Sequence, residues 1–216
     1  MALRLYTYWR SSAAFRVRIA LALKGLDYES VPRHLLRDGG EHRRADYLAL
    51  NPQGLVPALE HDGTVITQSL AICEYLEEVS PRPALLPSGP ADRAVVRAMA
   101  LVVACDVHPL NNLSVLMYLR GELGQGDAAV TGWTRHWIDR GFTALEQLIA
   151  RHSADGLHCF GTSVTLADVF LVPQVVNSRR VQLDLAPYPT LAKVAQHLES
   201  LPAFRAARPE AQPDAE

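Results

Sequence analysis

The feature that most constrains the fold is the junction between a short apolar strand and a helix near the start of the chain. Residues 3–7 (LRLYT) have the pattern of a strand, and helical spacing begins just after Ser11 and Ser12. At such a junction the unpaired backbone N–H groups and the positive end of the helix dipole face the same spot. An anion is favoured there, and a thiolate is an anion. The three cysteines of the chain lie elsewhere, so a thiolate at this turn would belong to a ligand.

The first 80 residues carry strand and helix signals in the order βαβ, α, ββ, α. The first helix is predicted to bury an apolar face with Phe15 and Ile19, leaving Arg16, Arg18 and Lys24 off that face. Further strands are expected at 28–31, 56–60 and 65–68, and helices at 41–50 and from 69 to about 78. The two later strands flank an Asp-Gly turn, which is a hairpin signal.

The remainder of the chain reads as helical. A proline-rich stretch at 80–90 has no periodicity and is interpreted as a linker. After it, helices are expected at 91–120, 131–152, 165–177, 189–200 and 202–207. The tail at 211–216 is expected to be frayed. These signals predict two domains, an α/β domain at 1–82 and an all-helical domain at 90–216.

One helix start carries a strong local signal. Thr165 is predicted to be an N-cap and Asp168 stands three residues on, which is a capping box. Val164 and Val169 have the spacing of a hydrophobic staple. We interpret this motif as a folding device rather than as a site.

Composition excludes several classes of function. The net charge is −2 with no basic run, which argues against a dedicated nucleic-acid binder. Three scattered cysteines suit a reducing compartment and fit neither a disulfide framework nor a metal site. The start of the chain has no signal-peptide pattern, and no run approaches the ~18 apolar residues of a membrane helix. These observations predict a cytoplasmic protein with no membrane or nucleic-acid partner.

Three segments could carry chemistry, and each has a purely structural alternative. Ser11 and Ser12 could simply cap the first helix, and no pattern of a serine hydrolase surrounds them. A cis bond before Pro57 would expose the backbone of Val56 to an extended peptide, although most X-Pro bonds are trans. Ser69 lies at a helix start, where a carboxylate could bind or the serine could be a plain cap. Together the three segments suit a small acidic peptide that carries a thiol.

The chain resembles the zeta class of glutathione transferases over essentially its whole length. The class motif, roughly SSCxWRVRIAL, stands here as SSAAFRVRIAL at 11–21. Further matches are ALNP at 49–52, VPAL at 56–59, QSLAI at 68–72, HPLNNL at 108–113, LVPQV at 171–175 and PYPT at 187–190. The motif cysteine is Ala13 and the motif tryptophan is Phe15, so neither of those side chains is required here.

The resemblance implies a fold and an activity. The fold would be that of glutathione transferases, with a thioredoxin-like βαβ-α-ββα domain followed by a helical domain. The activity would be a glutathione-dependent cis–trans isomerisation of maleylacetoacetate in tyrosine and phenylalanine breakdown, and glutathione would be the cofactor. The assembly would be a homodimer that acts on a small cis-dienoic keto acid.

The resemblance also implies roles for individual residues. Ser11, or its neighbour Ser12, would hydrogen-bond the glutathione sulfur and lower its pKa. A planar guanidinium suits a substrate carboxylate, so Arg180 would hold one, with Arg10 as a second substrate-binding residue. Arg179 is the weaker candidate. The residues expected to bind glutathione are Gln53, Val56, Pro57, Gln68, Ser69, His108 and Asn112, with the bond before Pro57 in the cis form.

Three other functions compete with this one. Maleylpyruvate isomerases of gentisate breakdown carry two arginines after the corresponding Asn-Asn pair, whereas Leu113 and Ser114 stand here. A general zeta-class transferase acting on small α-haloacids is a second alternative. A glutathione-binding scaffold without catalysis is the third, because a fold does not fix a function. The set of Ser11, Gln68, Ser69 and Arg180 argues against a scaffold, which has no need for a thiol and carboxylate site.

Overall fold

The computed structural model describes residues 3–216. The chain forms two compact units: one ends at Ala84 and also contains Ser200–Glu216, and the other is Leu85–Glu199. The expected class, an α/β unit joined to a helical one, is confirmed. The last segment was expected in the helical domain, but Ser200–Glu216 belongs to the first unit. There Arg18 donates from Nε to the carbonyl oxygen of Ala207 over 3.0 Å.

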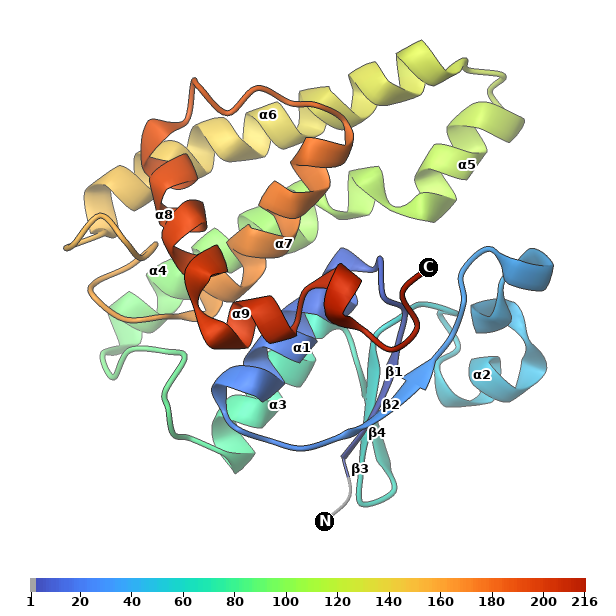
Figure 1. Ribbon diagram of the computed structural model, residues 1–216, viewed down its shortest axis with the longest axis horizontal. Helices are drawn as coiled ribbons and strands as arrows, with labels where there is room; N and C mark the ends of the chain where they lie inside the picture. Colours follow the sequence, from blue (N-terminus) through green and yellow to red (C-terminus); the bar gives the residue numbers. More distant parts are fainter. Residues whose placement is uncertain (1–2) are drawn as a thin grey trace. The chain divides into compact units, whose positions relative to one another are not determined.

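The first unit is built on a mixed sheet with the strand order β2-β1-β3-β4 (Figure 1). The central strand β1 (Leu3–Thr7) runs parallel to β2 (Glu29–Pro32) and antiparallel to β3 (Ala58–His61). The hairpin from β3 to β4 (Thr64–Thr67) turns through Asp62 and Gly63, which both have positive φ. That turn type matches the twist of the strands, as the Asp-Gly signal predicted.

Helices cover both faces of this sheet. α1 (Ser12–Leu23) and α3 (Ser69–Val79) pack together, while α2 (Ala45–Leu50) lies on the opposite side (Figure 1). Tyr47 of α2 belongs to an apolar cluster with Tyr6 and Tyr8 at the end of β1. The short α9 (Pro202–Ala206) packs against α1. The helix starts of α1 and α3 therefore belong to the same rigid layer.

The burial of α1 differs from the expectation. Every residue from Ala13 to Leu21 is buried, including Arg16 and Arg18, which are each 1% exposed. Lys24 is buried as well, and its Nζ donates to a carboxylate oxygen of Glu77 over 2.8 Å. The prediction of a single apolar face with the three basic residues off it therefore misses that these residues are buried too.

The second unit is helical throughout. Its helices are α4 (Pro90–Leu101), α5 (Leu113–Gly121), α6 (Asp127–His152), α7 (Leu166–Arg180) and α8 (Pro189–Ser200), of which the final residue, Ser200, is counted with the first unit. The single helix expected at 91–120 is broken by a π-helical turn at Val102–Val107 and a 3₁₀ turn at Pro109–Asn111. Proline cannot donate a backbone hydrogen bond, so the helix restarts after it.

The run Pro90–Gly121 is long and apolar enough to cross a membrane by length and composition alone. The expectation that no run approaches that length therefore needs correction. A core helix of a soluble protein passes the same test, and the break at Pro109 leaves backbone groups without helical partners. Length and composition are weak grounds for a membrane helix here.

Two further local features can be compared with the expectations. The capping box of α7 is confirmed, because the Thr165 N–H donates to Asp168 Oδ2 over 2.7 Å. The tail was expected to be frayed, but it makes polar contacts. The Trp9 N–H donates to Asp214 Oδ2 over 3.0 Å, and Arg37 binds the Glu216 carboxylate. These polar contacts hold the tail against the first unit.

Candidate active site

The strand-to-helix junction forms a tight turn that ends in the cap of α1. The N–H of Ser11 donates to the carbonyl oxygen of Tyr8 over 2.9 Å. Ser11 is the N-cap, and its Oγ accepts the N–H of Ala14 over 3.2 Å. Because that contact uses a lone pair of the oxygen, the hydroxyl proton is left to donate elsewhere. Ser12 is the first helical residue, so the two serines have different local roles.

The start of α3 lies beside this cap and is tied to it by an arginine. Arg16 on α1 donates from Nη1 to the Oγ of Ser69 over 3.1 Å. Ser69 was expected to cap α3, but it is the first helical residue and Gln68 is the N-cap. The buried guanidinium adds positive charge near two helix starts, which favours anions there.

Gln68 has a strained backbone. Its φ is 68° and its ψ is 118°, a region that residues with a side chain rarely occupy. Its Nε2 donates to Oε1 of Gln53 over 2.8 Å, so two residues expected at the site touch each other. Strain of this kind persists where the surrounding structure holds it and is common at ligand sites.

Val56 and Pro57 form the loop edge that the sequence predicted. The bond between them is cis, as expected. Among residues 3–216, the backbone N–H and C=O of Val56 make no hydrogen bond. The carbonyl oxygen of Leu55, just before it, accepts from Tyr47 and Asn51. An extended peptide could therefore pair with Val56 as a strand pairs with a sheet edge.

His42 lies close to the same loop and was not singled out from the sequence. It is 8% exposed, and its carbonyl oxygen would lie 3.2 Å from a Cβ placed on Gly54. Its Nδ1 is buried without a hydrogen-bond partner among the described residues. Burial, with Arg43 nearby, lowers the pKa of His42, so the imidazole is neutral at pH 7.

The remaining expected residues are on the second unit, with one exception. His108 follows the π-helical turn, and Asn112 caps α5 by accepting the Ser114 N–H at 3.0 Å. Arg180 is the exposed last residue of α7. The exception is Arg10, which is exposed in the first unit with its guanidinium 5.4 Å from the Trp9 ring centre.

The two neighbouring arginines at the end of α7 are not equivalent. Arg179 makes a bidentate contact with Glu199, with Nη–Oε distances of 2.7 and 2.9 Å. A guanidinium engaged in this way is less available to a substrate carboxylate. This contact bears on Arg179, which the sequence analysis took as the weaker candidate.

None of the cysteines lies at the candidate site. Cys73 and Cys159 are buried and Cys105 is exposed on the π-helical turn. Burial raises the pKa of the Cys73 thiol to about 12. Any thiolate held at the cap of α1 would therefore come with a ligand.

The geometry of the first unit suits one kind of ligand. A hydroxyl donor at a helix start can stabilise a thiolate, an unpaired strand edge can bind a peptide backbone, and a second helix start can bind a carboxylate. Sequence reasoning found each of these three parts. It missed Arg16 and Arg18, whose partners are distant in the sequence, and no local signal marked them.

Comparison with known proteins agrees with this geometry. The family described as "Glutathione S-transferase, N-terminal domain" matches residues 10–79. A maleylacetoacetate isomerase of Pseudomonas aeruginosa is 53% identical over 98% of each chain. A solved maleylpyruvate isomerase, titled a bacterial glutathione S-transferase of the zeta class, has a TM-score of 0.95 with 48% identity, covering 99% of this chain and 100% of its own. A maleylacetoacetate isomerase of Anaeromyxobacter dehalogenans, solved with bound GSH in its active site, has a TM-score of 0.88 with 46% identity, covering 100% of this chain and 98% of its own.

Proposed function

The chain belongs to the zeta class of the glutathione S-transferase family, and we propose that it is a glutathione-dependent isomerase that converts maleylacetoacetate to fumarylacetoacetate. The observation that carries the proposal is the pairing of two helix starts through Arg16, with Ser11 at one and Ser69 at the other. Beside them, the unpaired backbone of Val56 offers a strand edge.

The residues of the first unit would bind the cofactor and set its charge. Bound glutathione would supply the thiolate nucleophile that a cis–trans isomerisation of this kind needs. We assign Ser11 the role of donor to the sulfur, because its oxygen already accepts from the helix and its proton is left to donate. Hydrogen bonding to the charged form lowers a thiol pKa, which raises the thiolate fraction at neutral pH.

The other residues of this unit would hold the peptide part. We assign the backbone of Val56, next to Pro57, to the cysteinyl unit, since extended backbone pairs with extended backbone. Gln68 and Ser69 would bind the γ-glutamyl end, where the start of α3 favours a carboxylate. Gln53 would support Gln68 through the side-chain contact of 2.8 Å.

Residues of the second unit would serve the substrate side. Addition to a conjugated ketone places negative charge on its carbonyl oxygen, and a fixed cation is most useful where charge develops. We assign Arg180 to the substrate, because the resemblance to the zeta class implies a carboxylate-binding arginine at this position and a planar guanidinium suits that task. His108 and Asn112 would line the cofactor, and Arg10 would be a second cation for the substrate.

The experiment that tests the function is a rate measurement with two substrates. Isomerisation of maleylacetoacetate is followed with and without glutathione, and maleylpyruvate is run in parallel. We expect strong glutathione-dependent turnover of the first substrate and weak turnover of the second. The solved maleylpyruvate isomerase is 48% identical to this chain, against 53% for the maleylacetoacetate isomerase of Pseudomonas aeruginosa, so a reversed preference would assign the chain to gentisate breakdown. No turnover of either would leave a transferase or a binding protein.

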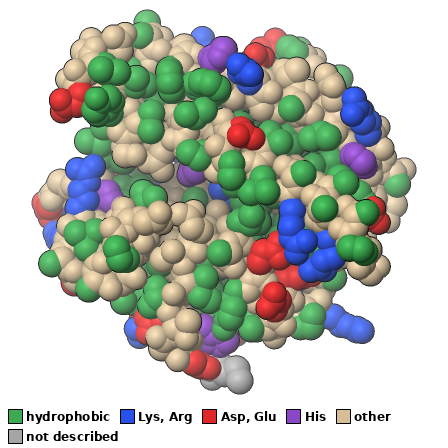
Figure 2. Space-filling model, turned by 180° about the vertical axis from the view of Figure 1, so that it is seen from behind, with side chains coloured by type: hydrophobic (Ala, Val, Ile, Leu, Met, Phe, Trp, Pro, Cys, Tyr) green, Lys and Arg blue, Asp and Glu red, His purple; other side chains and the backbone are tan. Residues whose placement is uncertain are grey.

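We also propose that the protein is a cytoplasmic homodimer. Its free cysteines suit a reducing compartment. Hydrophobic side chains gather on the surface of the second unit in Figure 2, and Met117, Tyr118 and Leu123 are 45%, 56% and 52% exposed. Exposed apolar side chains that gather on one part of a surface often mark an interface. Sedimentation should give twice the chain mass of 23.7 kDa, and a single-chain mass would contradict the dimer.

A further inference from the structure

The tail of the chain reaches the turn that carries the proposed thiolate donor. Asp214 accepts the backbone N–H of Trp9 through Oδ2 at 3.0 Å. Trp9 is two residues before Ser11, inside the turn closed by the Ser11 N–H and the Tyr8 carbonyl. A side chain more than 200 positions away therefore holds the middle of this turn.

Arg18 holds the same turn from the other side. Its Nη2 donates to the carbonyl oxygen of Trp9 over 3.1 Å, and its Nη1 donates to Thr7 Oγ1 over 3.1 Å. Both backbone groups of Trp9 are therefore anchored, the carbonyl by Arg18 and the N–H by Asp214. Because the N–H and the carbonyl oxygen of Trp9 are both held, the peptide that follows Trp9 has little freedom to rotate.

We propose that Asp214 is a positioning residue, which orients the hydroxyl of Ser11 toward the cofactor sulfur by fixing the backbone of Trp9. The inference rests on the proposed function, because it assumes that Ser11 meets a thiol. Catalysis of this kind is sensitive to placement, since a shift of about 1 Å can cost about a hundredfold in rate.

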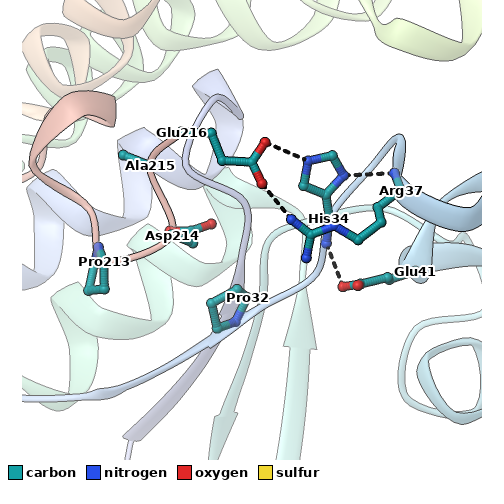
Figure 3. A pocket seen from close by; sticks show the side chains of 8 residues that line it. All are labelled: Pro32, His34, Arg37, Glu41, Pro213, Asp214, Ala215 and Glu216. Atoms are coloured by element: carbon teal, nitrogen blue, oxygen red, sulfur yellow. Dashed lines mark hydrogen bonds and ion pairs between the residues drawn. The ribbon is translucent and has the colours of Figure 1, made fainter.

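The tail has its own anchors, which keep Asp214 in place. Figure 3 shows the carboxylate of Glu216 directed at His34 and Arg37, with ion-pair distances of 3.6 and 2.5 Å. The Nε2 of Gln212 donates to the carbonyl oxygens of Ala206 and Arg208 over 3.0 and 2.8 Å. The tail is therefore attached before and after Asp214.

The tail and the loop after β2 line an open pocket of about 400 Å³. Its lining includes Pro32 and Glu41 besides the tail residues drawn in Figure 3. The second oxygen of Asp214, Oδ1, is buried and has no hydrogen-bond partner among the described residues. The contact of Oδ2 with Trp9 is thus the hydrogen bond through which this side chain acts within residues 3–216.

The test compares Asp214→Ala with Asp214→Asn. The alanine variant removes the acceptor, whereas the asparagine variant keeps an oxygen that can accept the same N–H. We expect Asp214→Ala to raise the pKa of the bound glutathione thiol, followed by thiolate absorbance, and to lower kcat about tenfold. The KM for glutathione should change less than about threefold, because the residues proposed to hold the peptide are untouched. Asp214→Asn should restore both values.

Two further measurements separate positioning from folding and from charge. Hydrogen exchange of the Trp9 amide, measured without glutathione, should accelerate in Asp214→Ala and not in Asp214→Asn. Glu210→Gln removes an exposed carboxylate from the same segment and should leave the thiol pKa and kcat unchanged.

Each other outcome overturns the inference. An unchanged thiol pKa and kcat in Asp214→Ala would show that the contact is only structural. An equal loss in Asp214→Asn would assign the effect to charge rather than to the hydrogen bond. Failure of the unmodified protein to bind glutathione would overturn the proposed function as well, and the exchange of the Trp9 amide would still report whether Asp214 holds the turn.

Discussion

Replacement of Asp168 by alanine should strongly destabilise the second unit. The carboxylate is 0% exposed and accepts the N–H groups of Cys159 and Thr165, each over 2.7 Å, and the hydroxyl of Thr165 over 2.9 Å. Cys159 and Thr165 are buried themselves, so water cannot replace the lost acceptor.

The magnitude follows from the two backbone donors. A buried donor left without a partner costs about 1–3 kcal/mol, so two cost about 2–6 kcal/mol. Burial raises the pKa of Asp168, which shows that desolvation opposes its charge and that removing the charge offsets part of this cost. We therefore expect a loss of about 3 kcal/mol in the free energy of unfolding. For a chain of this size that lowers Tm by roughly 6–12 °C.

A matched control is available in the same unit. Asp155 also accepts two backbone N–H groups, those of Leu157 and His158 at 2.8 and 3.2 Å, and its Oδ2 lies 2.7 Å from His158 Nδ1, but the residue is exposed. Asp155→Ala should cost below about 1 kcal/mol, because water can take its place. Urea unfolding of both variants gives the comparison. Equal losses in the two variants, or a loss below about 1 kcal/mol for Asp168→Ala, would refute the argument from buried donors.

Three further predictions concern the candidate site and the thiols. Ser11→Ala should raise the pKa of the bound thiol and slow turnover about a hundredfold, measured as a pH–rate profile, whereas an equal effect of Ser12→Ala would move the donor role. Arg180→Ala should raise the KM for the keto acid about tenfold while Arg179→Ala leaves it near the original value, and the reverse would exchange the two roles. Cys105 should be the one thiol that reacts with a chromogenic disulfide in the folded protein at pH 8, because raised pKa values keep the two buried thiols protonated. More than one equivalent before unfolding would contradict that burial.

Local signals predicted the parts of the site that depend on neighbours in sequence. The cap at Ser11 and the box at Thr165 each use donors within three residues, so residue type and spacing were enough. The cis bond before Pro57 is different in kind. The sequence allowed it, and the family resemblance rather than any local preference gave the expectation.

Tertiary contacts decided what the sequence could not show. Arg16 and Arg18 look solvent-exposed by periodicity, but Ser69 and Ala207 supply buried acceptors from 53 and 189 positions away. A charged side chain can be buried only where such partners exist, and periodicity contains no information on distant partners. The tail at 211–216 was misjudged for the same reason, since its anchors are on the first third of the chain.

The charge pattern at the helix starts explains why a serine, rather than an aspartate, suits the first turn of α1. At the start of α7 the carboxylate of Asp168 satisfies the donors and cancels the positive end of the dipole. The first turns of α1 and α3 contain no acidic residue, so their positive ends are not cancelled from within the helix. A carboxylate at position 11 would accept the same N–H but would repel a thiolate and would have no proton to donate. A neutral hydroxyl accepts the N–H at the helix start, and the positive end of the helix dipole remains available to a bound anion.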